Sequence, residues 1–176
     1  MEIKRSIYRF IYYRFARWLP ESYSKLGGAI GKSVRYHVCR NIFEYCGKNV
    51  NIERGASFGT GYNIRIGDNS GIGINATIPN GTIIGNNVMM APNCFVHSVN
   101  HRFERTDIPM CKQGYYPSKP LIVEDDVWIG QNVTIMVGRK ISTGSIIAAN
   151  CVLTKDFPPY SIVGGNPSRL IKSRLQ

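Results

Sequence analysis

The chain has 176 residues and a formal net charge of +11, because 22 Lys and Arg outnumber 11 Asp and Glu. Apolar residues make up 43% of it, which excludes wholesale disorder, and the length excludes two full domains. No apolar run reaches the roughly 18–20 residues that a membrane-spanning helix needs. The five cysteines form no Cys-x-x-Cys pair, so we expect a cytoplasmic protein without a zinc site.

The N-terminal segment, residues 1–45, is basic and predicted to be partly helical. Residues 1–40 hold nine basic and two acidic residues, which suits an anionic partner, although no nucleic-acid motif accompanies them. Six apolar residues share one broad helix face: Ile3, Ile7, Phe10, Ile11, Phe15 and Trp18. Two interpretations stay open. The helix caps the structure that follows or packs in an oligomer, or residues 1–20 make peripheral contact with a membrane.

A six-residue repeat runs through residues 46–165. Large aliphatic residues recur at every sixth position in two runs, namely Ile66, Ile72, Ile78, Ile84, Met90, Val96 and then Val123, Ile129, Ile135, Ile141, Ile147, Leu153. A weaker start through Ile52 and Phe58 slips by two residues across 59–62. Period six fits a short strand and a tight turn with one inward residue, so we predict an all-β coil of short parallel strands.

A long insertion separates the two runs. Val96 and Val123 are much further apart in the sequence than one repeat allows, so a segment more than three repeats long leaves the coil. We place this excursion loop at residues 97–120. It opens with His97 and His101, two of the three histidines in the chain. Long loops in compact repeat proteins usually carry function, and we expect part of an active site here.

Four ordered motifs resemble those of the hexapeptide-repeat acyltransferases, in particular the sugar and xenobiotic O-acetyltransferases. They are Asn100-His101, Trp128-Ile129-Gly130, Thr154-Lys155-Asp156 and Gly165-Asn166-Pro167. Residues 39–47 are similar to members from bacterial surface-polysaccharide pathways. The resemblance implies a left-handed parallel β-helix with three hexapeptides per coil and about five coils. Residues 166–176 would form a C-terminal tail. It also implies acetyl-CoA as co-substrate, no metal, and a homotrimer with sites between subunits.

The resemblance assigns the catalytic role to His101. Moving an acetyl group to a hydroxyl needs a base, and histidine titrates near neutral pH. His97 is the nearest rival for this role. Glu104 or Asp107 could orient the ring, and the sequence does not rank them. Asn100, or a backbone N–H near Gly130, could stabilise the oxyanion.

The resemblance also assigns the residues that hold the two substrates. Asn75, Asn80 and Asn100 would line the acceptor pocket, although asparagine is also common as a structural residue at β-helix corners. Coenzyme A is long and anionic, so amides and cations should hold it. The residues implied for the pantetheine arm and the nucleotide end are Trp128, Gly130, Ala149, Thr154, Lys155, Arg169 and Lys172.

Our leading hypothesis is an O-acetyltransferase for a sugar or glycan hydroxyl in surface polysaccharide synthesis, located in the cytoplasm or at the inner face of the membrane. An N-acetyltransferase of an amino sugar nucleotide and a non-catalytic β-helix scaffold are the alternatives. A zinc carbonic anhydrase on the same fold would need three histidine ligands, and only His97 and His101 lie near one coil.

Overall fold

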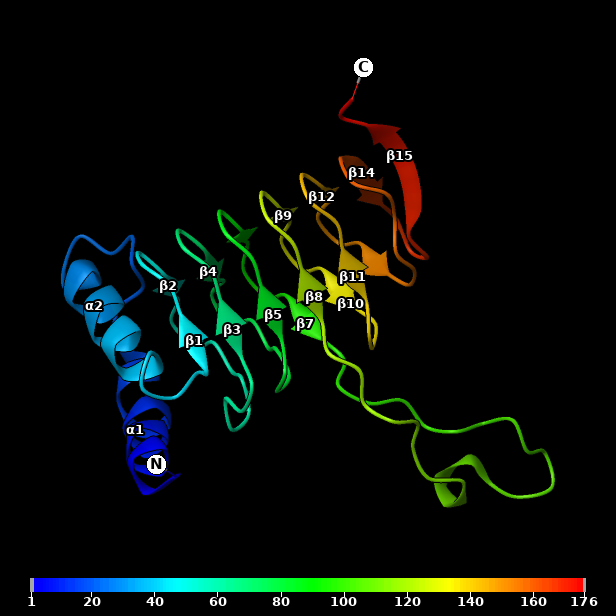
Figure 1. Cartoon of the computed structure of the whole chain (residues 1–176), viewed down its shortest axis with the longest axis horizontal. Helices are drawn as coiled ribbons and strands as arrows, with labels where there is room; N and C mark the ends of the chain where they lie inside the picture. The colour runs from blue at the N-terminus through cyan, green and yellow to red at the C-terminus, as the bar shows by residue number, and fades with distance from the viewer. Residues whose placement is uncertain (1, 176) are drawn as a thin grey trace.

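The computed structural model describes residues 2–175 as a parallel β-helix with two helices at its N-terminal end (Figure 1). Met1 and Gln176, the outer ends of the segments 1–45 and 166–176, lie outside the described residues. The helices are α1 (Glu2–Arg14), the 3₁₀ turn η1 (Ala16–Trp18) and α2 (Gly28–Cys39). The predicted fold class is confirmed.

Three faces of short parallel strands form the β-helix. The first face holds β1 (Tyr45–Cys46), β3 (Arg65–Ile66), β5 (Ile83–Ile84), β8 (Ile122–Val123) and β11 (Lys140–Ile141). The second holds β2 (Asn51–Ile52), β4 (Gly71–Ile72), β6 (Met89–Met90), β9 (Trp128–Ile129), β12 (Ile146–Ile147) and β14 (Ser161–Gly164), with antiparallel β15 (Arg169–Ser173) at its C-terminal edge. The third holds β7 (Phe95–Val96), β10 (Thr134–Ile135) and β13 (Val152–Leu153). The second face therefore runs through six coils, one more than the roughly five expected from the repeat.

The strand register shows how the repeat builds the coils. Ile66 pairs with Ile84, its counterpart three repeats further along the chain, so a regular coil holds three hexapeptides. Ile52 pairs with Ile72, and the turn through Gly59 and Gly61 lengthens that coil by two residues. Met90 pairs with Ile129 across the excursion loop, so the loop is accommodated without shifting the ladder. The predicted period, slip and insertion are all confirmed.

Aliphatic side chains fill the interior of the coil. All twelve residues of the two predicted runs are buried. Asparagines turn the corners with φ near +54° to +60°, a conformation that asparagine tolerates better than most residues. Four of them bond edge to edge along one corner through their side-chain amides: Asn75, Asn93, Asn132 and Asn150. The corners therefore repeat with the same spacing as the core.

The helices cap the open end of the β-helix, but not through the apolar face expected from the sequence. Tyr12 is fully buried, stacks on Phe58 with ring centroids 4.5 Å apart, and donates its hydroxyl to the Ala56 carbonyl at 2.9 Å. Tyr13 donates likewise to the Gly59 carbonyl. Of the six residues predicted to form the packing face only Ile11 packs on the core, and Ile3, Ile7, Phe10, Phe15 and Trp18 are exposed. The cap needs hydroxyl donors for the carbonyls of the first coil, and tyrosine supplies both the ring and the donor.

A buried ion pair fixes α2 to the β-helix at β2. Arg35 is fully buried, and its Nη2 lies 3.6 Å from Oε2 of Glu53. Its Nη1 donates to the carbonyls of Leu19 and Pro20. Burial alone would raise the pKa of Glu53, but hydrogen bonds from Ser22 and Asn51, together with Arg35, outweigh burial and hold that pKa below its usual value.

We predict that Glu53→Gln lowers the free energy of unfolding at pH 7 by about 3 kcal/mol, because it leaves the buried Arg35 charge without its partner. A depressed folded-state pKa gives stability that is complete above the unfolded value of about 4.3 and is lost as the pH falls through the folded value. The variant should therefore lose less stability than the wild type between about pH 5 and pH 3. Urea unfolding at several pH values measures both effects.

Glu44→Gln is the matched control, because Glu44 pairs with Arg65 on the surface with its side chain 44% exposed. Exposed pairs contribute little, so its stability at pH 7 should stay close to the wild type. Equal stability and equal pH dependence of Glu53→Gln and the wild type would show that the buried pair does not hold the cap.

Candidate functional site

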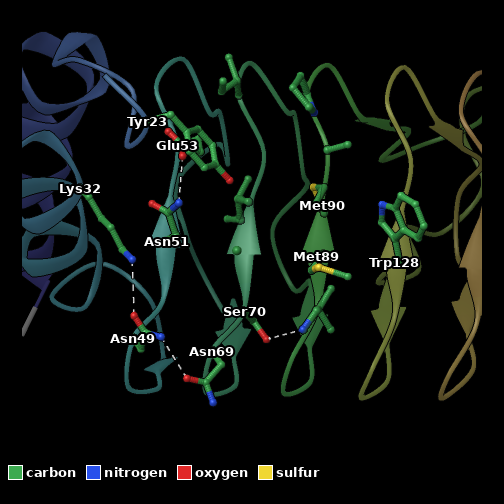
Figure 2. Close-up of a pocket in the computed structure, with 16 residues that line it drawn as sticks. Tyr23, Lys32, Asn49, Asn51, Glu53, Asn69, Ser70, Met89, Met90 and Trp128 are labelled. Carbon is green, nitrogen blue, oxygen red and sulfur yellow. Dashed lines mark hydrogen bonds between the residues drawn. The ribbon is translucent and has the colours of Figure 1, made fainter. Parts of the chain in front are cut away.

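A groove of about 420 Å³ crosses the second face at its N-terminal end (Figure 2). The outward positions of four neighbouring strands on this face are Asn51, Gly71, Met89 and Trp128. Gly71 has no side chain, so the surface is hollowed between Asn51 and Met89. Tyr23 and Lys32 also line the groove, from the helical cap. The groove therefore lies between the cap and the β-helix.

One end of the groove is polar and the other is apolar. At the polar end the side-chain amide of Asn51 donates to Glu53 at 2.9 Å, and Lys32 reaches Asn49 at 3.5 Å. Oδ1 of Asn51 is buried and has no hydrogen-bond partner within residues 2–175. At the other end Trp128 and Met89 are 50% and 60% exposed. The exposed amides of Asn49 and Asn69 at one end, with an aromatic ring at the other, suit a ligand that has hydroxyl groups and an apolar face.

The excursion loop, which contains His101, leaves the prism between β7 and β8 and extends away from it (Figure 1). His101 forms a bridge with Tyr115 across the loop, and their ring centroids lie 4.3 Å apart. The loop also holds a 3₁₀ turn, η2 (Met110–Lys112). His101 is exposed, whereas His97 is half-buried at the root of the loop with its ring 5.0 Å from that of Phe95. Of the two histidines, His101 is therefore the more accessible.

Neither carboxylate considered for orienting His101 is free to do so in this chain. Glu104 accepts a hydrogen bond from the Tyr116 hydroxyl, which lowers the pKa of Glu104. Asp107 is paired with Arg105, and the hydrogen bond lowers the pKa of Asp107. Within the loop, the His101 ring instead packs against the ring of Tyr115.

The three asparagines proposed for the acceptor take part in local structure. Asn75 has φ 54° and belongs to the corner row of amides. Asn80 accepts hydrogen bonds from the Thr60 hydroxyl at 3.0 Å and the Tyr62 N–H at 3.3 Å. It therefore stabilises the turn at residues 59–62, which contains the two extra residues. The Asn100 carbonyl accepts from the Tyr116 N–H at 2.9 Å within the loop. Asn75 and Asn80 do not line the groove.

The residues expected to bind coenzyme A lie in the C-terminal half of the β-helix. Gly130 and Ala149 stack at one corner so closely that a Cβ on Gly130 would lie 2.6 Å from the Ala149 nitrogen. At the next corner Thr154 bonds to Ser168 at 3.0 Å, and Lys155 lies over the Phe157 ring. Arg169 and Lys172 project from β15. Strand β15, which bears Arg169 and Lys172, lies at the C-terminal end of the prism, whereas the excursion loop extends away from the prism (Figure 1).

Sequence reasoning missed the polar end of the groove, where Lys32, Asn51 and Glu53 meet. The available signal was the glycine at position 71, where an outward-facing residue of a strand is expected. Using it requires knowing that residue 51 pairs with residue 71, which depends on the two extra residues in that coil.

Within residues 2–175 no cluster of three or more His, Cys, Asp or Glu side chains is placed to hold a metal ion. In the same range no helix combines the length and apolarity that crossing a bilayer requires.

Comparison with known proteins supports the architecture. Residues 63–98 match the model of the bacterial transferase hexapeptide (six repeats), and residues 120–155 match that of the hexapeptide repeat of succinyl-transferase. The structure is similar to a maltose O-acetyltransferase from Clostridium difficile 630, with a TM-score of 0.75 and 29% identity, over 98% of this chain and 87% of that one. It is also similar to a galactoside acetyltransferase in complex with coenzyme A, with a TM-score of 0.74 and 28% identity, over 98% and 81% of the two chains.

The curated relatives match over shorter stretches. The galactoside O-acetyltransferase of Escherichia coli (strain K12) is 36% identical over 92 residues, which are 50% of this chain and 42% of that protein. The chain spans less than half the length of the curated relatives it matches.

Proposed function

We propose that the chain is an acetyl-CoA-dependent O-acetyltransferase of the hexapeptide-repeat, left-handed β-helix family and that it acts on a sugar hydroxyl. The observation that carries the proposal is an exposed, loop-borne histidine on the same prism as a groove with a polar and an aromatic end. The similarity of residues 39–47 to polysaccharide-pathway members supports a glycan of the bacterial surface as acceptor. Residues 46–165 would form the catalytic β-helix, with residues 1–45 as cap and 166–176 as tail.

The groove supplies contacts that suit a sugar acceptor. The exposed amides of Asn49 and Asn69 can donate to and accept from sugar hydroxyls, and Lys32 offers a donor beside them. Trp128 can cover the apolar face of a sugar ring. Asn100 remains a candidate for a further contact, because only its backbone carbonyl is engaged and its side chain is exposed, whereas the side-chain amides of Asn75 and Asn80 hold local structure.

The residues of this chain suit coenzyme A, the acetyl donor, whose thioester supplies an acetyl group activated for transfer. Lys155, Arg169 and Lys172 are exposed and form no ion pair among the described residues, so they are available to phosphates. Gly130 and Ala149 leave a corner without bulky side chains, along which a narrow chain can lie, with Thr154 at the next corner.

His101 would take the proton from the acceptor hydroxyl as its oxygen attacks the acetyl carbonyl, and would return a proton to the departing sulfur. Asn100, or a backbone N–H near Gly130, would stabilise the negative charge that develops on the carbonyl oxygen. Tyr115, in ring contact with His101, would hold the imidazole in place. An amine acceptor would need less help from a base, so the N-acetyltransferase alternative predicts a smaller role for His101.

We expect the enzyme to lie in the cytoplasm. All five cysteines are free thiols, and Cys39, Cys94 and Cys151 are buried in the core. Free thiols persist in a reducing compartment. A non-catalytic scaffold would not bind acetyl-CoA, so thermal-shift measurements with acetyl-CoA separate that alternative from both enzymes.

We predict that His101→Ala lowers kcat for O-acetylation by roughly 10²–10⁴, the range for a lost general base, with little change in the affinity for acetyl-CoA. His97→Ala is the control, because His97 lies at the root of the loop and should cost far less. Steady-state kinetics with a panel of sugars measure both. A larger loss for His97→Ala than for His101→Ala would assign the base to His97.

We predict that replacing Lys155, Arg169 or Lys172 by alanine raises KM for acetyl-CoA and leaves kcat nearly unchanged, because each cation binds ground state and transition state alike. The effect should shrink at high salt. Lys48→Ala, at an exposed position near the capped end, is the control and should change neither parameter. If acetyl-pantetheine, which lacks the nucleotide, shows the same KM ratios as acetyl-CoA, these cations do not contact its phosphates.

We predict a homotrimer, because the excursion loop that bears His101 extends away from the prism, where the surface of another chain would complete a site (Figure 1). Sedimentation equilibrium should give three times the chain mass of 19.7 kDa. Co-expressing His101→Ala with Trp128→Ala should restore about a quarter of the wild-type activity if base and groove come from different chains. A stable monomer, or no recovery in the mixture, would contradict this arrangement.

A further inference from the structure

Helix α1 has two apolar faces, and the fold uses only one. Tyr8, Ile11 and Tyr12 pack on the end of the β-helix. On the opposite side of the helix Ile3, Ile7 and Phe10 are 80%, 55% and 58% exposed. Their spacing of four and three residues places them in one stripe along the helix. Because the cap is complete without it, this outer stripe is not explained by the packing of the chain.

Basic side chains border the outer stripe. Lys4 is exposed on one flank, and Arg14 continues the stripe one turn beyond Phe10, where its guanidinium lies 5.8 Å from the Phe10 ring. On the other flank Ser6 lines the stripe, and the half-buried Arg9 lies further round the helix, beside Thr60 and Tyr62. Glu2 is the single acidic residue within α1. Beyond the helix Phe15 and Trp18 are also exposed, at 64% and 57%, with Arg17 over the Trp18 ring. Apolar and aromatic residues bordered by cations match the boundary between lipid chains and anionic headgroups.

A second copy of the chain fits this stripe less well than lipid does. From Ile3 to Phe10 the stripe is only about 10 Å long, far smaller than a standard protein interface. Pairing it with its own copy would also bring Lys4 and Arg14 of two chains together, and like charges across an interface are unfavourable. An anionic bilayer would instead neutralise them.

We propose that the outer stripe of α1 docks the protein on an anionic lipid bilayer, with the helix lying in the plane of the surface. Ile3, Ile7 and Phe10 enter the headgroup boundary while Lys4 and Arg14 contact lipid phosphates. The cap holds α1 through Tyr12 and Tyr13, so docking requires no rearrangement of the β-helix. The proposal does not depend on the acetyltransferase activity.

Vesicle flotation tests the proposal with the full chain. At low salt the protein should float with vesicles that contain phosphatidylglycerol and not with pure phosphatidylcholine vesicles, and high salt should release it. The double variant Ile7→Ser/Phe10→Ser should lower the partition coefficient by about tenfold or more, because the apolar area that enters the bilayer is lost. Ile7→Leu/Phe10→Leu keeps the apolar stripe and is the matched control, so it should float like the wild type.

Substitutions are preferable to deletion of α1, because deletion would uncover Phe58 beneath Tyr12. Circular dichroism and sedimentation of each variant show whether the fold and the oligomeric state are kept. Failure of the wild-type protein to float, equal binding to neutral vesicles, or unchanged flotation of the serine variant would each overturn the proposal. A serine variant that dissociates into smaller oligomers would instead show that a second copy covers the stripe.

Discussion

The stacking of one aliphatic side chain per hexapeptide on its counterpart a coil away is the constraint on which the rest of the molecule depends. It forces every ladder to the same offset of three repeats, so Ile66 meets Ile84 and Ile129 meets Ile147. Added residues are accepted only where they leave the ladder unshifted. They therefore occur at corners, as the two-residue slip at 59–62 and as the excursion loop at 97–120. Because the inward positions have to stay aliphatic, polar and reactive side chains occur at the corners and the outward positions.

The first coil has no preceding coil to cover it, and the N-terminal helices cover it instead. Tyr12 supplies a ring for Phe58 and a hydroxyl for a carbonyl, while Arg35 and Glu53 tie α2 to β2 beneath it. Once the inner face of α1 is used in this way, its other apolar residues have no partner in the described part of the chain. The stripe is therefore exposed because α1 is apolar on two sides and only one of them packs on the chain.

The sequence predicted the β-helix closely because period six involves a single inward residue, and each of the twelve residues concerned is buried. It predicted a capping helix but the wrong face, since a hydrophobicity pattern favours Ile3 and Phe10 over Tyr12 and Tyr13, which also donate hydrogen bonds. The groove escaped prediction because Asn51, Glu53 and Trp128 become neighbours only through the register. His101 was predictable as a candidate from its place in a loop, whereas the partners of Glu104 and Asp107 depend on how that loop folds.

A solenoid is quasi-one-dimensional, because each coil contacts only the coil before it and the coil after it. Its interior is filled by aliphatic side chains, so a base, an acceptor and a donor have to converge on its outer surface. A long loop helps them to do so only if it reaches a surface beyond its own coil. In this chain the loop leaves the prism between β7 and β8 and turns outward, while the groove lies beside the cap and the cations of β15 lie near the C-terminal end (Figure 1). Under the proposed function, association of chains would bring these three features of the surface together without interrupting the core.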